Sequence, residues 1–311
     1  MAQKHFLSLA DWSREEIELL FELAATIKAS PESYASSLAG QSLAMIFQKA
    51  STRTRVSFEV GMFQLGGQAL FLSASDIQLH RGETIADTAR VLSRFVHGIM
   101  ARVYAHQDIL DLAGYASVPV INGLSDLLHP CQALADYFTL RERRGELAGL
   151  KLAYVGDGNN VAHELMYGAV KLGMRFSIGC PKGYEPNAQV CRGALHEAQK
   201  QGTPAPELTS DPLQAVRGAD VVYTDVWTSM GQEAESARRL AAFQGFEVTP
   251  ALMAAAGSQA VFMHCLPAHR GEEVAADVID GPQSVVFDEA ENRLHVQKAV
   301  LVTLLGDKGE D

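Results

Sequence analysis

Residues 42–65 read SLAMIFQKASTRTRVSFEVGMFQL, and this stretch decides the fold. The apolar run at 42–47 predicts a buried strand, and residues 53–65 predict a helix that ends at the Gly66-Gly67 pair. Only a short polar turn separates the two. A strand that leads directly into a helix is the repeating unit of folds in which helices cover both faces of a parallel sheet.

The same unit recurs along the chain. Further strands are predicted at 68–72, 98–103, 119–122, 151–156, 176–179, 221–224 and 260–265. Further helices are predicted at 84–95, 131–144, 160–172 and 289–305. An earlier helix is expected after Ser13, which forms a capping-box pattern with Glu16. The expected fold class is therefore α/β, with doubly wound parallel sheets.

The length of 311 residues fits two domains of ordinary size. The helix at 131–144 ends in a charged tail followed by Gly145, and the alternation of strands and helices restarts after it. We therefore expect one domain at 1–145 and a second at 146–288. The closing helix, with the residues up to about 306, is long enough to pack back on the first domain.

The composition excludes several classes of protein. A formal net charge of -11 disfavours nucleic acid and anionic membranes as partners. No run of residues approaches the length of an apolar membrane span, and the N-terminus has no apolar signal region. The four cysteines follow neither a disulfide nor a zinc-site spacing. We expect a cytoplasmic protein without a structural metal.

The turn inside the opening stretch has the character of an anion site. It reads Ser51-Thr52-Arg53-Thr54-Arg55 at the start of a helix, where free backbone N–H groups and the helix dipole attract negative charge. Arg53 and Arg55 add fixed charges that can bind phosphate in a bidentate manner. A capped helix with solvated arginines is the alternative, but three hydroxyls and two arginines in five residues favour the anion site.

A second motif, His129-Pro130-Cys131-Gln132, opens the helix at 131–144. His129 can donate to a carbonyl oxygen, and Gln132 can both donate and accept, as an amide group of a ligand requires. A histidine satisfied beside a helix start is the alternative.

The second half of the chain carries Gly156-Asp157-Gly158-Asn159-Asn160 after a predicted strand. This turn partly imitates a dinucleotide-binding fingerprint, so an NAD-dependent dehydrogenase stays open as an alternative. The third glycine of that fingerprint is missing, and the next strand ends without an acidic residue for a ribose. Two asparagines are better suited to a carboxylate or an amide.

Two further motifs follow predicted strands. Asp225 precedes Ser229-Met230-Gly231, where the carboxylate could hold an ammonium group and the glycine could allow a loop to close. The other motif is His264-Cys265-Leu266-Pro267. Cys265 could be a nucleophile, as in a cysteine hydrolase, or a positioning group. Neighbours on a strand point to opposite faces, so His264 is poorly placed to activate it.

Four of these motifs, in this order, resemble those of the aspartate/ornithine carbamoyltransferase superfamily: the motifs at 51–55, 129–132, 225–231 and 264–267. The last two resemble its ornithine-using branch. The resemblance covers about residues 6–305. It implies a carbamoyl phosphate domain at 1–145 and a Rossmann-like ornithine domain at 146–288, joined by long helices. It also implies transfer of the carbamoyl group to the side-chain amine of L-ornithine, giving L-citrulline in arginine biosynthesis. A homotrimer with active sites shared between subunits, and neither metal nor organic cofactor, are implied as well.

The resemblance assigns roles to individual residues. Carbamoyl phosphate is expected to be bound by Ser51, Thr52, Arg53, Thr54, Gln78, Arg102, His129, Gln132, Cys265, Leu266 and Arg293. Ornithine is expected to be bound by Asn160, Asp225, Ser229 and Met230. The chemical step is expected to involve Cys265, Arg102, His129 and Asp225. Alternatives are a carbamoyltransferase for putrescine or acetylornithine, the dehydrogenase, and a non-catalytic amino-acid-binding protein.

Overall fold

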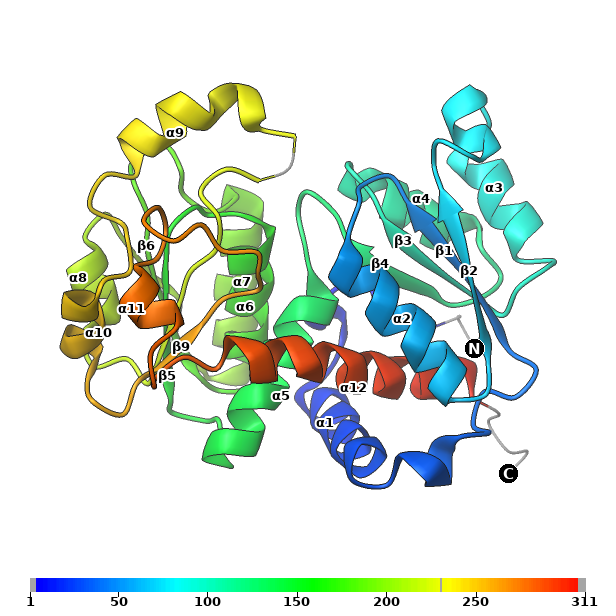
Figure 1. The fold of residues 1–311 in the computed structure, drawn as a ribbon, viewed down its shortest axis with the longest axis horizontal. Helices are drawn as coiled ribbons and strands as arrows, with labels where there is room; N and C mark the ends of the chain where they lie inside the picture. The colour runs from blue at the N-terminus through cyan, green and yellow to red at the C-terminus, as the bar shows by residue number, and fades with distance from the viewer. Residues whose placement is uncertain (1–3, 230, 307–311) are drawn as a thin grey trace. The chain divides into compact units, whose positions relative to one another are not determined.

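A computed structural model describes residues 4–229 and 231–306 of the chain (Figure 1). Two compact units are present: Met1–Phe138 with Glu291–Asp311, and Thr139–Ala290. Both dividing points fall inside helices, α5 (Pro130–Arg144) and α12 (Val286–Leu305). Below, the first is called unit 1 and the second unit 2.

Unit 1 is built on a four-stranded parallel sheet with the order β2-β1-β3-β4. The strands are β1 (Ser42–Phe47), β2 (Gln68–Ser73), β3 (Gly98–Arg102) and β4 (Val120–Leu124). The central strands β1 and β3 are almost wholly buried, which explains why they appear in the sequence as continuous apolar runs. All four strands match predicted ones to within two residues.

The helices of unit 1 begin where their caps predict. Ser13 and Glu16 form the predicted capping box at the start of α1, and Ser51 caps α2 by accepting from the Thr54 N–H. The helices are α1 (Arg14–Ala29), α2 (Thr52–Gln64), α3 (Ile85–Leu92) and α4 (His106–Tyr115), with part of α5 and most of α12. Helix α4 was not predicted. Helix α2 packs on α12 at Gly61, where an added Cβ would lie in ordinary van der Waals contact, 3.4 Å from the Lys298 side chain.

Unit 2 contains a five-stranded parallel sheet with the order β7-β6-β5-β8-β9. The strands are β5 (Lys151–Val155), β6 (Arg175–Gly179), β7 (Glu207–Thr209), β8 (Val221–Tyr223) and β9 (Val261–Met263). The edge strand β7 was not predicted, because it is short and largely exposed and therefore lacks an apolar pattern. Two parallel sheets with helices confirm the predicted fold class.

The helices of unit 2 surround this sheet (Figure 1). They are α6 (Asn160–Lys171), α7 (Ala188–Gln201), α8 (Pro212–Val216), α9 (Ser236–Ala242), α10 (Pro250–Ala256) and α11 (Ala276–Ile279). Of these, only α6 was predicted. The segment after Ser229, expected to be a loop, includes the 3-10 turn η4 (Glu233–Glu235) and α9. None of the helices in the described part of the chain is both long enough and apolar enough to cross a membrane.

The strand order places the functional loops. In unit 1 the order reverses between β1 and β3, and in unit 2 it reverses between β5 and β8. In open parallel sheets, ligands bind beyond the carboxyl ends of the strands at such reversals. Arg102 ends β3, and Arg53 lies in the first turn of α2, the helix that follows β1. Asn160 begins α6, the helix that follows β5, and Asp225 lies in the loop after β8.

Candidate functional site

The first group of predicted site residues lies at the N-terminus of α2. Ser51 Oγ accepts from the Thr54 N–H at 3.2 Å, which fixes the first turn of the helix. Thr54 is fully buried, Arg53 is half-buried, and Thr52 is exposed. The remaining N–H groups of this turn and the positive end of the helix dipole create a positive environment beside Arg53.

Arg293, on α12, joins three elements of unit 1. Its guanidinium donates to Gln132 Oε1 at 2.7 Å and to Thr54 Oγ1 at 3.1 Å. The Arg293 side chain is only 3% exposed, so a cationic group is held in the interior at the point where α2, α5 and α12 meet. Gln132 in turn donates to Asp136 Oδ1 at 2.8 Å, which fixes the orientation of its amide.

His129 lies at the centre of a positive region, called here the arginine cluster (Arg53, Arg102, Arg293 and His129). Burial lowers the pKa of His129 well below its ordinary value, and Arg293, Arg102 and Arg53 lower it further. The imidazole is therefore neutral near neutral pH. Its Nδ1 is buried and has no hydrogen-bond partner among the described residues. A neutral donor among fixed cations is suited to a ligand that carries both a carbonyl oxygen and negative charge.

The low pKa of His129 predicts a pH dependence of stability. In the unfolded chain the imidazole regains a pKa of about 6.5 and takes up a proton below it, whereas the folded state does not. The contribution is therefore fully present above about pH 6.5 and is lost as the pH falls below that value. We expect His129→Asn to reduce the loss of unfolding free energy between about pH 7.5 and 5.5 by up to about 1.4 kcal/mol.

Urea denaturation at the two pH values checks this expectation. The exposed His196 provides a matched control, because His196→Asn should leave the pH dependence as it is in the unmodified protein. Equal pH dependence in the unmodified protein and in His129→Asn would contradict the neutral, buried imidazole.

Two residues of unit 1 lie outside the arginine cluster. The guanidinium of Arg55 stacks over the Phe71 ring at 3.7 Å and pairs with Glu59 at 3.0 Å. The sequence expectation that Arg55 helps to hold an anion stays a prediction. Gln78, itself exposed, begins the 3-10 turn η3 (Gln78–Arg81) and makes no hydrogen bond to the arginine cluster in the described structure.

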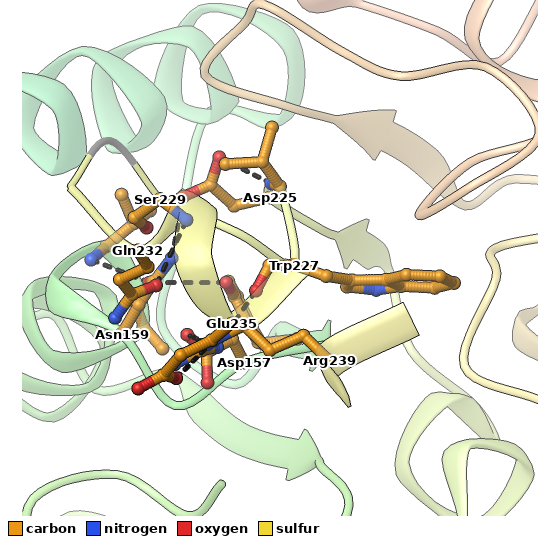
Figure 2. A network of polar contacts seen from close by, with 12 residues as sticks. Asp157, Asn159, Asp225, Trp227, Ser229, Gln232, Glu235 and Arg239 are labelled. Atoms are coloured by element: carbon orange, nitrogen blue, oxygen red, sulfur yellow. Dashed lines mark hydrogen bonds and ion pairs between the residues drawn. The ribbon is translucent and has the colours of Figure 1, made fainter. Parts of the chain in front are cut away.

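The second group lies in unit 2 around Asp225 (Figure 2), at the end of β8. Asp225 Oδ2 accepts from Asn159 Nδ2 at 2.7 Å, and Oδ1 accepts from the Cys265 thiol at 3.0 Å and from the Val226 N–H at 2.8 Å. Asn160 occupies the first turn of α6 and is half-buried. Asn159, Asp225 and Cys265 are called the Asp225 cluster below. Its buried carboxylate is suited to a cationic ligand group.

The surroundings of Cys265 argue against a cysteine nucleophile activated by His264. The Nδ1 atom of His264 accepts from the Leu266 N–H at 2.8 Å, so Nε2 carries the proton and faces Glu273 Oε1 at 3.3 Å. Both nitrogens are thus engaged, while the thiol itself donates to Asp225.

Leu266 has a φ of 56°, an uncommon conformation for leucine that costs about 1–3 kcal/mol. Such cost is typical of functional sites.

Ser229 is half-buried, and its N–H donates to Gln232 Oε1 at 3.1 Å. Met230, also predicted to bind the amino acid, lies outside the described residues. The glycine-rich turn does not favour a dinucleotide. A Cβ at Gly158 would lie 2.2 Å from Pro186 N, so the backbone of residues 185–186 already occupies the space where a pyrophosphate would approach.

Among the described residues, two groups of side chains have metal-binding donor types within 4.8 Å of one another. They are Asp225, His264 and Cys265, and His269, Glu272 and Glu273. In the first group Cys265 Sγ lies 3.0 Å from Asp225 Oδ1, and both His264 nitrogens have hydrogen-bond partners in the chain. The second group begins three residues after Leu266, and its Glu273 faces His264 Nε2 at 3.3 Å.

Family models match nearly the whole chain. Residues 4–142 match the carbamoyl-P binding domain of aspartate/ornithine carbamoyltransferase, and residues 148–304 match its Asp/Orn binding domain. The chain belongs to the aspartate/ornithine carbamoyltransferase family. The first match contains Arg53, Arg102 and His129, and the second contains Asp225 and Cys265.

Relatives within this carbamoyltransferase family are similar over their full length. An ornithine carbamoyltransferase of Thermococcus kodakarensis is 58% identical over 98% of this chain and 98% of its own. An anabolic ornithine carbamoyltransferase of Pyrococcus furiosus is 57% identical, again over 98% of both chains. The solved structure of the ornithine carbamoyltransferase from Pyrococcus furiosus superposes with a TM-score of 0.94, covering 100% of this chain and 99% of that one.

Sequence reasoning missed residues that shape the Asp225 cluster of this carbamoyltransferase. Asn159 was noted as part of a motif, but its role in holding Asp225 was not foreseen. Arg239, which donates to Asp157 and to the Trp227 carbonyl, was not considered at all. Its position within an amphipathic helix gives no signal, because only the tertiary structure shows that it is buried.

Proposed function

We propose that the chain transfers the carbamoyl group of carbamoyl phosphate to the side-chain amine of L-ornithine, giving L-citrulline and phosphate, in arginine biosynthesis. The observation that carries the proposal is the pairing of two unlike sites in two matched domains. Arg53, Arg102 and His129 of the arginine cluster lie in the carbamoyl-P binding match. Arg293 and the Asp225 cluster lie in the Asp/Orn binding match. The names of the similar proteins, one of them anabolic, support ornithine as the acceptor.

For carbamoyl phosphate, the phosphate group is bound by the N-terminal turn of α2 with Arg53. The neutral His129 and the buried Arg102 stabilise negative charge that develops on the carbamoyl oxygen. Gln132 recognises the amide of the carbamoyl group. Arg293 fixes the side chains of Gln132 and Thr54 relative to each other by donating a hydrogen bond to each. Carbamoyl phosphate is also proposed to be bound by Ser51, Thr52, Gln78, Cys265 and Leu266.

For ornithine, the α-ammonium and α-carboxylate groups set the specificity. Asp225 pairs with the ammonium group, and Asn160, Ser229 and Met230 complete the set that binds the amino acid. Putrescine keeps an amine in the place of the α-ammonium group but has no α-carboxylate. N-acetylornithine has an uncharged amide in place of the α-ammonium group, so each compound lacks one of the two groups. The carboxylate is already oriented by Asn159 and Cys265, which lowers the cost of binding.

The chemical step requires a neutral side-chain amine, because a protonated amine has no lone pair for attack on the carbamoyl carbon. The reference pKa of a lysine-like amine is about 10.4, so the reactive form is scarce at neutral pH and the rate rises as the pH increases. Alignment of the two reactants can contribute roughly 7–11 kcal/mol to the lowering of the barrier. Phosphate leaves with its charge stabilised by Arg53 and the α2 N-terminus.

Cys265 is expected to position the ornithine amine through its contact with Asp225. Cys265→Ser preserves a donor to Asp225 and should keep turnover, while the KM for ornithine rises by about 10-fold, the size of one weakened hydrogen bond. Steady-state kinetics and mass spectrometry of the intact protein check this. Cys191→Ser, at a half-buried cysteine far from β8 in sequence, serves as the control. Trapping of a carbamoyl-cysteine adduct would overturn the role.

Gln78 is proposed to act on a neighbouring subunit of a homotrimer. It is exposed and, among the described residues, makes no hydrogen bond to the arginine cluster of its own chain, which leaves it available to a second copy. A mixture of inactive Arg53→Ala and inactive Gln78→Glu chains should regain activity, since one interface can combine an intact Arg53 with an intact Gln78. If subunits exchange and the activity never exceeds that of the two parents, Gln78 serves no neighbouring site.

A cytoplasmic location belongs to the same proposal, because the four cysteines are all free and their spacing suits a reducing compartment.

The function is tested by measuring citrulline formed from carbamoyl phosphate and ornithine with the purified chain. Absence of citrulline under conditions in which both substrates are stable would refute it.

A further inference from the structure

Two loops of unit 2 are linked to each other by the side chains of Asn159 and Arg239, neither of which is proposed to contact a substrate (Figure 2). The loop after β5 contains Asp157 and Asn159, and the loop after β8 contains Asp225, Trp227 and Ser229. The first link is the hydrogen bond from Asn159 to Asp225. The second link consists of hydrogen bonds from Arg239, on α9, to both loops.

The orientation of the Asn159 side-chain amide is fixed by its hydrogen-bond partners. Its Oδ1 accepts from the Val161 and Ala162 N–H groups at 3.0 and 3.1 Å, and from the Tyr154 hydroxyl at 3.3 Å. The two backbone N–H groups can only donate, so they fix the position of the amide oxygen. The amide nitrogen of Asn159 must therefore face Asp225.

Arg239, which forms the second link between the two loops, is buried, with 7% of the residue exposed. Its Nη1 donates to Asp157 Oδ2 at 3.0 Å and to the Trp227 carbonyl at 2.9 Å, and its Nε donates to Glu235 Oε2 at 3.3 Å. The guanidinium also lies over the Tyr184 ring, 5.0 Å from its centroid.

The Asp157 carboxylate is ionised at neutral pH. Burial raises its pKa to about 6, Asp225 and Glu235 act in the same direction, and Arg239 opposes them. A charge-assisted bond to Arg239 therefore exists at neutral pH, and it directs the other bond of Nη1 toward the Trp227 carbonyl.

Trp227 lies in the chain between Asp225 and Ser229, two residues proposed to bind the amino acid. Its ring is directed away from these polar groups and stacks on Phe243, the residue that caps α9, with centroids 5.4 Å apart (Figure 2). The carbonyl of Trp227 is thus held by Arg239 on one side, while its ring is held in the apolar core on the other.

We propose that Arg239 is a positioning residue for the amino-acid substrate: held by Asp157, it fixes the Trp227 carbonyl and thereby the spacing of Asp225 and Ser229. This inference rests on the proposed function and adds a residue that positions its ornithine-binding groups. Arg239 makes its bonds to protein groups and acts on the substrate only through the 225–229 segment. Its loss should therefore weaken ornithine binding and leave carbamoyl phosphate binding unchanged.

The test compares Arg239→Gln, Arg239→Lys and the exposed neighbour Arg238→Gln as a matched control. Arg239→Gln should raise the KM for ornithine by about 10- to 100-fold, the effect of losing hydrogen bonds to a charged group, with the KM for carbamoyl phosphate within about 2-fold of its starting value. Arg239→Lys keeps the charge and one donor, so it should recover part of the loss. Arg238→Gln should change neither constant.

An unchanged KM for ornithine in folded Arg239→Gln would overturn the proposal, as would an equal loss for both substrates. Should the single variant fail to fold because Asp157 is left buried without its partner, the double variant Arg239→Gln/Asp157→Asn removes both charges. The double variant is expected to show the same rise in the ornithine KM, and an unchanged KM there would equally overturn the proposal.

Hydrogen exchange separates this inference from the proposed function. Amides of residues 225–229 should exchange faster in Arg239→Gln than in the unmodified protein, with no change in the amides of β1 and β3. This readout needs no activity, so it holds even if the unmodified protein makes no citrulline. Identical exchange at 225–229 in both proteins would refute the positioning role.

Discussion

Arg53→Ala should lower the affinity for carbamoyl phosphate by about 30-fold or more, equivalent to roughly 2 kcal/mol, while the fold stays intact. Arg53 is half-buried at the N-terminus of α2 and is one of the three arginines that depress the pKa of His129. Removing it takes a fixed charge from a site that must hold an anion. Isothermal titration calorimetry with carbamoyl phosphate or inorganic phosphate measures the loss directly.

Arg55→Ala is the matched control, since it changes the same residue type two positions along the same helix. The guanidinium of Arg55 is stacked on Phe71 and paired with Glu59, so its loss should change the affinity by no more than about 2-fold. Equal effects of the two substitutions would mean that long-range charge, and not the geometry of the arginine cluster, governs binding. Unchanged affinity in Arg53→Ala would remove this residue from the site.

Asp225→Asn should reduce kcat/KM for ornithine by about 100-fold or more, because it removes the charge proposed to pair with the α-ammonium group. Asn159 and Cys265 both donate to this carboxylate. An amide at position 225 would turn its own donor toward one of them and lose that bond. The variant should therefore affect both binding and alignment of the amino acid, while its KM for carbamoyl phosphate changes little.

Asp277→Asn, an exposed carboxylate on α11, is a suitable control and should leave the kinetics unchanged. Thermal unfolding of both variants guards against a general loss of structure. Retention of kcat/KM for ornithine in a folded Asp225→Asn protein would contradict the proposed recognition of the α-ammonium group.

Much of the fold could be predicted because its signals are local. The apolar run of β1, the hydroxyl cap at Ser51 and the stop at Gly66-Gly67 each act over a few residues. Strand β7 was not predicted because its burial is slight. Helices α8 to α11 were not predicted because they span only four to seven residues, too few to show a helical period. Helix α7 was missed although Asn187 caps it. The closing helix begins three residues before the predicted start, at Val286 instead of Glu289.

The site was harder to predict because side-chain direction depends on tertiary packing. Arg53 and Arg55 look equivalent in the sequence, but one joins the arginine cluster and the other stacks on Phe71. The adjacent asparagines are similarly divided, since Asn159 is used to orient Asp225. Arg239 is fourteen residues from Asp225 in the sequence, and only the burial of α9 brings it to Trp227.

A comparison of acceptor amines tests the central claim most directly. Initial rates of carbamoyl transfer from carbamoyl phosphate are measured with L-ornithine, N-acetylornithine and putrescine under the same conditions. The pairing of the α-ammonium group with Asp225 predicts that kcat/KM for ornithine exceeds that for N-acetylornithine by about 100-fold or more. Putrescine keeps an ammonium group that can pair with Asp225, so its lower kcat/KM is expected from the missing α-carboxylate. A kcat/KM for putrescine or acetylornithine equal to or above that for ornithine would contradict the account.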